Sequence, residues 1–411
     1  MDEKILKTYN GFDPNIIELV KNALKESGKP VIRLDQVSTK IEYEDKYSNV
    51  YKPNIHIGQR KLMLNEIQFL NRFIRFSVVS QTRQHFVIYA GGSPGHHMYE
   101  LSRYYPNVTF IVIDPSRHQS YLSDHLIVEE NKKPFYRRVI YYEVDNDYMH
   151  DLLSISTLGQ LLKSTIRIFV IKNYCSQELL TQIKAELPQE SKIYLWSDIR
   201  TDNAEAGKFG KDVHEFRKYV NKNRTDKFDT TVTDGDILWN LAMQYNWLKT
   251  LEPEASMFKF RCPFYTDDLD NLQKFMSNEI GKNDFEQCPE LKIIENYKLK
   301  NMLYPKGTIY IQPWQGVSST ESRLVIKKKN IHNLISYNAS EYDDTFNYYN
   351  LMERVVRKHN NGSEFYKYGY CECNDCAIEL TIFKDYLRIN ENTNHIKEEF
   401  SIPKHLNLVK V

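Results

Sequence analysis

Apolar and polar positions along the first half of the chain predict alternating helices and strands. Apolar residues recur every three or four positions over residues 13–27 and 58–75, as in amphipathic helices. From residue 85 short apolar runs alternate with helical patterns. The strands are expected at 86–90, 109–114, 138–143, 166–171 and 192–196, and the helices at 96–104, 147–163 and 176–186. This alternation predicts an α/β fold with a doubly wound, mostly parallel sheet and helices on both of its faces.

The second half of the chain continues the pattern after a polar interruption. Residues 202–235 contain few apolar anchors, which indicates an insertion or a mobile loop. Helices are then expected at 236–250 and 343–358, and strands at 256–262, 308–312, 322–328 and 377–383. We divide the sequence into an N-terminal extension (1–50), a main domain (51–335) and a C-terminal extension (336–411).

Composition narrows the class of protein. The chain has 411 residues, with 55 Lys and Arg against 54 Asp and Glu, so any nucleic-acid site must be a local patch. The N-terminus lacks an apolar signal core, and no apolar run is long enough to span a bilayer. We therefore expect a soluble, intracellular protein with no membrane partner. Six cysteines do not make a disulfide framework and are expected to be thiols or metal ligands.

A glycine-rich turn, Gly91-Gly-Ser-Pro-Gly95, separates the strand at 86–90 from the following helix. Such turns allow close approach of a nucleotide cofactor, although they also serve plain packing. The spacing differs from the Gly-x-Gly-x-x-Gly fingerprint of dehydrogenases, which disfavours an oxidoreductase and suits a cofactor without phosphates, such as S-adenosylmethionine. Asp114, at the end of the next strand, is expected to bind ribose hydroxyls; its alternative role is to cap the strand end.

Four further segments contain charged residues in a distinctive order. They are Gly58-Gln-Arg-Lys61, Ser197-Asp198-Ile-Arg200, Lys259-Phe-Arg-Cys-Pro-Phe264 and Glu321-Ser-Arg323-Leu. Each segment alone has an ordinary explanation, because charged residues at helix starts and strand ends are usually solvated or cap a turn. Their combination and order are distinctive.

Together these segments resemble the poxvirus family of cap-specific mRNA nucleoside 2′-O-methyltransferases, whose members also serve as processivity subunits of the viral poly(A) polymerase. The resemblance covers residues 43–358 and implies a Rossmann-like class I methyltransferase fold. It places a catalytic tetrad on Lys61, Asp198, Lys259 and Glu321. Lys259 would be the general base, helped by positive charge from Lys61 and Arg261, while the two acids would hold the ammonium groups. No metal is expected at this site.

The resemblance also assigns binding residues. The S-adenosylmethionine pocket would be lined by Gln59, Gly91, Ser93, Pro94, Gly95, His97, Asp114, Arg117 and Val144. The segment around Arg117 is one residue longer than in the family, and Glu143 stands where the family has an aromatic residue. The methylated cap would be held by Tyr43, Phe264 and Asp267, with Asp343 or Asp344 replacing a family glutamate that aligns with Phe346. Ordinary core and surface roles are the alternative for these cap residues.

The resemblance implies a viral enzyme of mRNA capping that methylates the first transcribed nucleotide of capped mRNA. It would come from another large DNA virus and act in the host cytoplasm, at the viral factory, with the virion as a second location. The alternative is an RNA-binding processivity subunit for a viral poly(A) polymerase catalytic subunit, and the two roles can coexist. RNA contacts are expected from basic residues in the 202–235 insertion and from Lys327–Lys329, although a solvated loop face explains the insertion equally well.

Three cysteines, Cys371, Cys373 and Cys376, lie beyond the resemblance. Such closely spaced thiolates bind zinc if a fourth ligand is available, for which the candidates are His359, Cys288 and His395. The other interpretation, favoured by the absence of a second cysteine pair, is three free thiols on a strand and a turn.

Overall fold

The structure is a computed structural model that describes twelve segments of the chain. They are residues 13–25, 28–42, 58–74, 85–95, 97–114, 141–144, 167–171, 173–199, 234–263, 301–316, 319–360 and 370–389. The chain divides into two compact units. The first contains Met1–Ser80, Thr308–Arg323 and Glu341–Val411, and the second contains Gln81–Gly307 and Leu324–Ser340.

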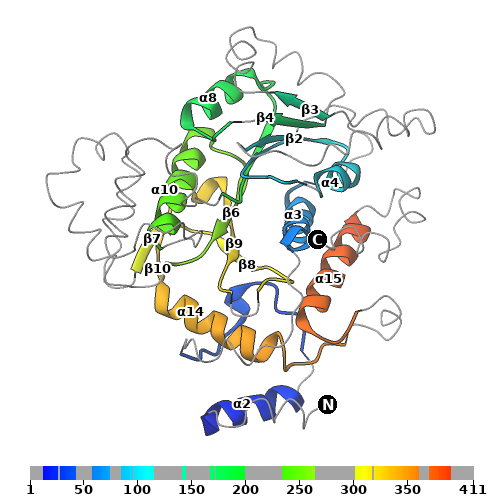
Figure 1. Ribbon diagram of the computed structural model, residues 1–411, viewed down its shortest axis with the longest axis vertical. Helices are drawn as coiled ribbons and strands as arrows, with labels where there is room; N and C mark the ends of the chain where they lie inside the picture. Colours follow the sequence, from blue (N-terminus) through cyan, green and yellow to red (C-terminus); the bar gives the residue numbers. More distant parts are fainter. Residues whose placement is uncertain are drawn as a thin grey trace, which may run out of the picture. The chain divides into compact units, whose positions relative to one another are not determined.

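The second unit is built on a twisted sheet with the strand order β3-β4-β2-β1-β5-β6-β9 (Figure 1). Each pairing from β3 to β6 is parallel. The strands are β1 (His85–Ala90), β2 (Val108–Ile113), β3 (Tyr141–Val144), β4 (Ile168–Ile171), β5 (Lys192–Ser197), β6 (Ala255–Phe260) and β9 (Ser322–Lys327), of which Leu324–Lys327 belong to this unit. The predicted α/β fold with a mostly parallel sheet is therefore confirmed.

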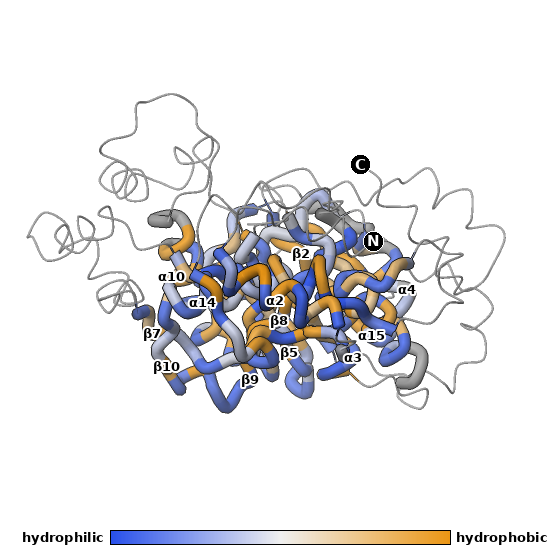
Figure 2. The backbone as a smooth tube through the Cα atoms, turned by 90° about the horizontal axis from the view of Figure 1, so that it is seen from below, coloured by the Kyte–Doolittle hydropathy of each residue, from blue (hydrophilic) through white to orange (hydrophobic). Residues whose placement is uncertain are grey.

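Helices on both faces of this sheet account for its continuous apolar strands. All six residues of β2 are buried, and Figure 2 shows hydrophobic stretches along the strands. Figure 1 shows α8 (Gln177–Glu186) and α10 (Asp234–Leu251) on one side and α4 (Met98–Tyr104) on the other. Ser176 is the N-cap of α8, because its hydroxyl accepts a 3.1 Å hydrogen bond from the Leu179 backbone N–H.

A small antiparallel pair of strands, β7 (Asn301–Pro305) and β10 (Leu334–Asn338), was not predicted. A 3₁₀ turn, η7 (Lys328–Asn330), precedes β10. Tyr304 anchors β7, because its buried hydroxyl donates a 2.9 Å hydrogen bond to the Leu241 carbonyl on α10. Both strands have only five residues, so their alternation is too short to stand out in the sequence.

The first unit contains most of the remaining elements. They are α2 (Pro14–Lys25), η1 (Leu34–Gln36), α3 (Gly58–Phe73), β8 (Thr308–Ile311), α14 (Ala339–Tyr348), the π-helical turn η8 (Tyr349–Glu353) and α15 (Asn374–Ile389). α3 and α15 lie side by side (Figure 1). Apolar residues of α2, such as Ile16 and Val20, form a core cluster with Leu351 and Met352 of η8. Sequence-distant segments therefore share one core.

The predicted strand at 377–383 is wrong, because these residues belong to α15. The side chains of Cys376, Leu380 and Phe383 are buried three and four positions apart, which is the spacing of one helix face. Additional apolar residues between them gave this short run the appearance of a buried strand. The interpretation of the cysteines as lying on a strand and a turn fails with it, since Cys376 is in the helix.

The predicted helix at 343–358 begins earlier, at Ala339, and changes form before its expected end. At η8 the Arg354 backbone N–H bonds the Tyr349 carbonyl, five residues before it, at 2.9 Å. Among the described residues, no helix is both long enough and apolar enough to cross a membrane.

Candidate active site

The glycine turn after β1 has backbone conformations that favour glycine. Gly91 has a φ of 77° and Gly95 a φ of 64°. A Cβ atom at Gly91 would lie 2.8 Å from the backbone nitrogen of Ile199, and one at Gly92 would lie 2.7 Å from Cγ1 of Val112. The first two glycines therefore have a packing role, since they let the turn fit closely against β2 and the segment after β5.

Asp114 connects this turn to the end of β2. Its Oδ2 atom accepts a 2.9 Å hydrogen bond from the Ser93 backbone N–H, and its own N–H donates to the Ile171 carbonyl at 3.0 Å. The residue is buried, with 7% of its surface exposed. β1 lies between β2 and β5, so the order of the strands reverses at this point. In doubly wound sheets, ligands bind at such reversals, outside the carboxyl ends of the strands.

The two other predicted pocket residues near this turn have different exposures. Pro94 is half-buried, while His97 is 4% exposed and directly precedes α4. The backbone of α4 begins with a 3.0 Å hydrogen bond from the Met98 N–H to the Gly95 carbonyl. The turn and the start of α4 therefore form one continuous backbone structure.

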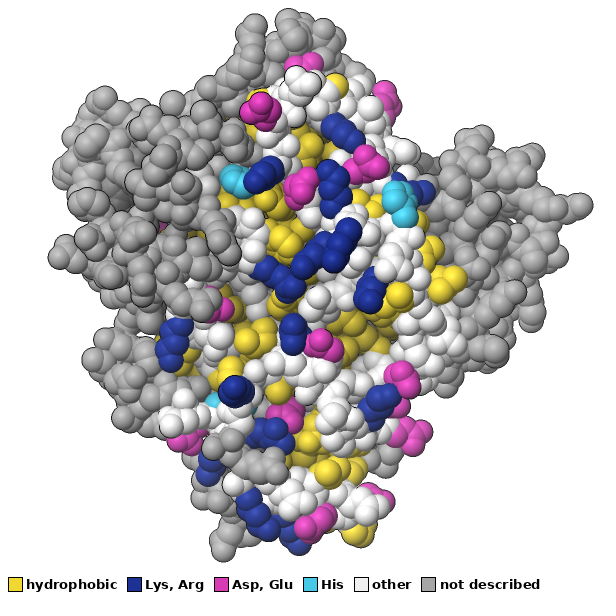
Figure 3. Space-filling view, turned by 180° about the vertical axis from the view of Figure 1, so that it is seen from behind, with side chains coloured by type: hydrophobic (Ala, Val, Ile, Leu, Met, Phe, Trp, Pro, Cys, Tyr) yellow, Lys and Arg dark blue, Asp and Glu magenta, His cyan; other side chains and the backbone are white. Residues whose placement is uncertain are grey.

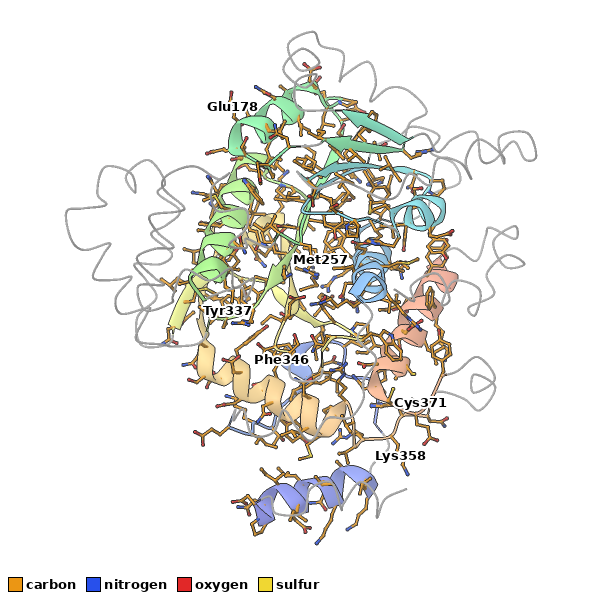
Figure 4. All side chains as sticks on the ribbon, in the orientation of Figure 1. Glu178, Met257, Tyr337, Phe346, Lys358 and Cys371 are labelled. Atoms are coloured by element: carbon orange, nitrogen blue, oxygen red, sulfur yellow. The ribbon has the colours of Figure 1, made fainter. Side chains whose placement is uncertain are left out.

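Asp198 and Lys259 meet because of the parallel register of β5 and β6. Ser197 is paired with Phe258, so the residues that follow, Asp198 and Lys259, lie opposite each other. The Lys259 Nζ atom is 3.4 Å from Oδ1 of Asp198, and each side chain is 18% exposed. The Asp198 backbone N–H also donates a 3.0 Å hydrogen bond to the Ala90 carbonyl, which fixes it beside the end of β1. Met257, labelled in Figure 4, marks the middle of β6.

Lys61 and Glu321 form a second ion pair, within the first unit. Nζ of Lys61, in the first turns of α3, lies 2.7 Å from Oε1 of Glu321. The same carboxylate oxygen accepts a 3.1 Å hydrogen bond from the side-chain amide of Gln312. Both charged side chains are largely buried, at 12% and 13% exposed. The four tetrad residues thus form two ion pairs of one lysine and one acid, one pair in each unit.

Arg60, which precedes Lys61 in α3, pairs with a buried acid on α15 that sequence analysis missed. The side chain of Glu379 is fully buried. Its two carboxylate oxygens accept hydrogen bonds of 2.6 and 3.0 Å from the Arg60 guanidinium. It also accepts hydrogen bonds from the Trp314 indole at 2.7 Å and the Tyr370 hydroxyl at 2.9 Å. Burial raises the pKa of Glu379 above its usual value, and the Arg60 guanidinium opposes that shift. With four donor contacts we assign Glu379 as a carboxylate.

Other predicted site residues fall outside the described parts of the chain. Tyr43, Arg117, Phe264 and Asp267 do so, as do Cys288, His395 and the basic residues of the insertion through 233. The structure describes only the backbone of Gln59, in α3, and of Val144, in β3. None of the cap-binding assignments at Tyr43, Phe264 and Asp267 is therefore tested.

The described alternatives for the cap and RNA sites differ in exposure. Phe346, labelled on α14 in Figure 4, is fully buried. Its ring packs against that of Tyr342, and the two ring centroids are 4.9 Å apart. Asp343 is also buried, while Asp344 is half-buried. Lys327–Lys329 are exposed, and Lys328 forms a 3.0 Å ion pair with Glu254.

Comparisons with known proteins identify the family. The sequence model described as "Poly A polymerase regulatory subunit" matches residues 26–156 and 211–408. The chain belongs to this poly(A) polymerase regulatory subunit family. It is 24% identical to the cap-specific mRNA (nucleoside-2′-O-)-methyltransferase of Myxoma virus (strain Lausanne) over 336 residues, which are 80% of this chain and 78% of the relative. The protein of the same name from Fowlpox virus (strain NVSL) is 22% identical over 243 residues, 58% of this chain and 57% of the relative.

Membership of this regulatory subunit family confirms the resemblance to it. Three of the four charged segments lie in the matched regions, and the segment with Asp198 lies between them. The matched regions include α3, the glycine turn and Asp114, as well as Lys259, Glu321 and α15. They extend past residue 358, where the sequence resemblance ended. Glu379 lies in that extension, and sequence analysis missed it because a lone acid in an apolar run gives no indication of a partner more than 300 residues away.

Proposed function

We propose that this family member is an S-adenosylmethionine-dependent methyltransferase that methylates the 2′-hydroxyl of the first transcribed nucleotide of capped mRNA. The observation that carries the proposal is the ion pair of Asp198 and Lys259, at the carboxyl edge of the sheet and beside the glycine turn. The names of the Myxoma virus and Fowlpox virus relatives support the same reaction.

The residues around the glycine turn fit S-adenosylmethionine. The buried Asp114 carboxylate stands where an acid accepts hydrogen bonds from ribose hydroxyls, and no cluster of cations for phosphates is required. Backbone of the turn and His97 would line the adjacent wall, with Gln59, Arg117 and Val144 completing the pocket. When bound, the cofactor supplies a methyl group that is already activated by a positively charged sulfur.

Lys259 would carry the proton transfer. A ribose 2′-hydroxyl is a weak nucleophile, so a base must take its proton if its oxygen is to attack a methyl donor. The Lys259 amine can do so only after losing its own proton to solvent. Asp198 would keep the lysine in position, because both side chains are fixed by the register of neighbouring strands. Lys61 and Glu321 would form the other half of the tetrad.

Recognition of a methylated cap is assigned to Tyr43, Phe264 and Asp267. A cationic purine stacks favourably between electron-rich rings, and an acid can accept hydrogen bonds from its edge. Binding of the RNA phosphate backbone requires only a local patch of positive charge on the protein surface. On the face shown in Figure 3, several exposed Lys and Arg side chains lie among uncharged and hydrophobic ones.

A second function, as regulatory subunit of a poly(A) polymerase, is supported by the family itself. In this role the chain would bind RNA and the catalytic subunit and raise the processivity of polyadenylation. The two functions are compatible, since one RNA-binding protein can serve both ends of an mRNA. We place both in the host cytoplasm, at the viral factory, and in the virion.

Methyl transfer from labelled S-adenosylmethionine distinguishes these functions. The purified full chain is incubated with otherwise identical RNAs that carry a methylated cap, an unmethylated cap or no cap. We expect label on the 2′-oxygen of the first nucleotide only with the methylated cap. Absence of transfer, together with binding of the purified poly(A) polymerase catalytic subunit, would reject the methyltransferase and support the second function alone.

A further inference from the structure

Three cysteine side chains meet where α15 begins. The Sγ atoms of Cys371, Cys373 and Cys376 all lie within 4.8 Å of one another. Figure 4 labels Cys371 beside the beginning of this helix. In the described part of the chain, no other group of three His, Cys, Asp or Glu side chains comes close enough together to hold a metal ion.

The spacing of the sulfur atoms is that of ligands around one zinc ion. Zinc–thiolate bonds are about 2.3 Å long and point to the corners of a tetrahedron, so two sulfurs on one zinc lie about 3.8 Å apart. The Sγ atoms of Cys371 and Cys376 are 3.7 Å apart. A disulfide would require about 2.05 Å. The Cys371 and Cys376 sulfurs therefore have the separation of two ligands on one zinc ion, and the Cys373 sulfur lies within 4.8 Å of both.

Backbone N–H groups also point at these sulfurs, as expected for ligands that carry negative charge. The Cys371 N–H lies 3.3 Å from the sulfur of Cys376, and the Cys373 N–H lies 3.4 Å from the sulfur of Cys371. Cys376 is in the first turn of the sixteen-residue α15, where the helix dipole favours negative charge.

Neighbouring residues hold the cluster in this geometry. The side chain of Asn374, between the cysteines, exchanges hydrogen bonds of 2.9 and 3.1 Å with the backbone of Val31. Arg354 forms a buried 3.0 Å ion pair with Asp375. A site preorganised in this way loses little conformational entropy when a metal binds.

We propose that Cys371, Cys373 and Cys376 bind one zinc ion that stabilises the start of α15. The three thiols would release their protons to solvent as the zinc–sulfur bonds form. Cys371 is exposed, so water can occupy the fourth coordination position. His359, the described candidate for a fourth ligand, is not within the 4.8 Å group. This zinc site is independent of the proposed methyl transfer.

Metal analysis of the untagged full-length protein tests the proposal. Zinc is measured by elemental analysis after gel filtration, for the wild type, Cys371→Ser, Cys373→Ser and the control Cys175→Ser. Cys175 is half-buried and precedes α8, outside the cluster. We expect about one zinc ion per chain in the wild type and the control, and loss of that zinc in both cluster variants.

Replacement by cobalt provides a second measurement on the wild type, which does not depend on how the variants fold. Cobalt added to the metal-free protein should give thiolate-to-metal charge-transfer absorption and the strong visible bands of a tetrahedral site. Absence of these bands and of zinc binding in the reduced wild type would overturn the proposal. Unchanged zinc content in both cluster variants would overturn it as well.

Discussion

Lys259 is the residue on which the proposed chemistry depends most directly. Replacement by alanine removes the base and leaves the glycine turn and Asp114 intact. We predict that Lys259→Ala lowers methyl transfer to capped RNA by at least about a hundredfold, with little change in the dissociation constant for S-adenosylmethionine. Single-turnover kinetics and calorimetry measure the two effects separately.

Lys192 provides the matched control for this substitution. It is exposed and lies at the opposite end of β5 from Asp198. Lys192→Ala should transfer methyl groups at the wild-type rate. Near-normal turnover by Lys259→Ala would contradict the assignment of the base.

Asp114 has a structural task and a proposed binding task that one substitution can separate. Asparagine keeps an oxygen that can accept the hydrogen bond from the Ser93 N–H, so Asp114→Asn should fold normally. It loses the negative charge that strengthens hydrogen bonds from ribose hydroxyls. We predict about tenfold weaker binding of S-adenosylmethionine, or roughly 1.4 kcal/mol. The exposed Asp35→Asn is the control, and equal affinities in the two variants would argue against the ribose contact.

At the scale of elements, the turn between β1 and α4 should tolerate no side chain at its first glycine. In Gly91→Ala the new methyl group would meet the Ile199 backbone at 2.8 Å, and alanine would have to adopt a φ of 77°. We predict a loss of at least about 2 kcal/mol in the free energy of unfolding by urea.

Gly316 is the corresponding control, because among the described residues a Cβ there would have one neighbour within 4 Å, at 3.8 Å. Gly316→Ala should change the free energy of unfolding by less than about 0.5 kcal/mol. A similarly small effect of Gly91→Ala would show that the turn can move away from Ile199.

The contact between α3 and α15 depends on the buried Glu379. In Glu379→Gln the Arg60 guanidinium, which is 13% exposed, would lose its charged partner. Breaking a buried pair in this way is expected to cost about 3 kcal/mol in unfolding experiments. Glu18→Gln removes the acid of an exposed pair with Lys21 and should cost less than about 0.5 kcal/mol. Equal stability of the two variants would refute a structural role for Glu379.

Three strands and one helix show how much of the fold the hydrophobic pattern predicted. The hydrophobic runs located β1, β2 and β5 to within a residue or two, because strands buried on both faces are continuously apolar. The same rule failed at α15, where an apolar run belongs to a helix that is buried on most sides. Periodicity alone does not separate these cases over seven residues.

At the scale of the whole molecule, acid should weaken the fold through His85. Burial, assisted by the Lys192 charge, lowers the pKa of His85 to about 4. In the unfolded chain it would titrate near 6.5, so the unfolded state binds the proton first as the pH falls. The contribution of neutral, buried His85 to the free energy of unfolding is complete above about pH 6.5. It is lost progressively as the pH falls to about 4.

Urea unfolding between pH 7.5 and 4 checks this prediction, with His85→Gln as the comparison. This range includes both the unfolded-state pKa of His85, near 6.5, and its native-state pKa of about 4. Glutamine does not titrate, so the variant should lose less stability on acidification than the wild type. Identical pH profiles would show that His85 is not the residue responsible. The measurement concerns stability alone, because His85 lies at the opposite end of β1 from the glycine turn.

The sequence named the four residues of the proposed tetrad but did not indicate how they pair. The motifs gave the order of the four tetrad residues, yet the register of β5 and β6 decides that Asp198 faces Lys259. Lys61 and Glu321 are 260 positions apart, and their ion pair depends on how the first unit folds. Such long-range pairings leave no periodic pattern in a single sequence.

The assembly of the first unit from distant segments has a consequence for synthesis of the protein. Arg60 and Glu379 are 319 residues apart. At roughly 5–20 residues per second, the ribosome would add Glu379 on the order of 16–60 seconds after Arg60. Until then, α3 lacks the helix whose Glu379 carboxylate pairs with the Arg60 guanidinium. Nascent chains that stop before α15 would therefore expose this surface to chaperones and proteases, so a stable product would require translation through α15.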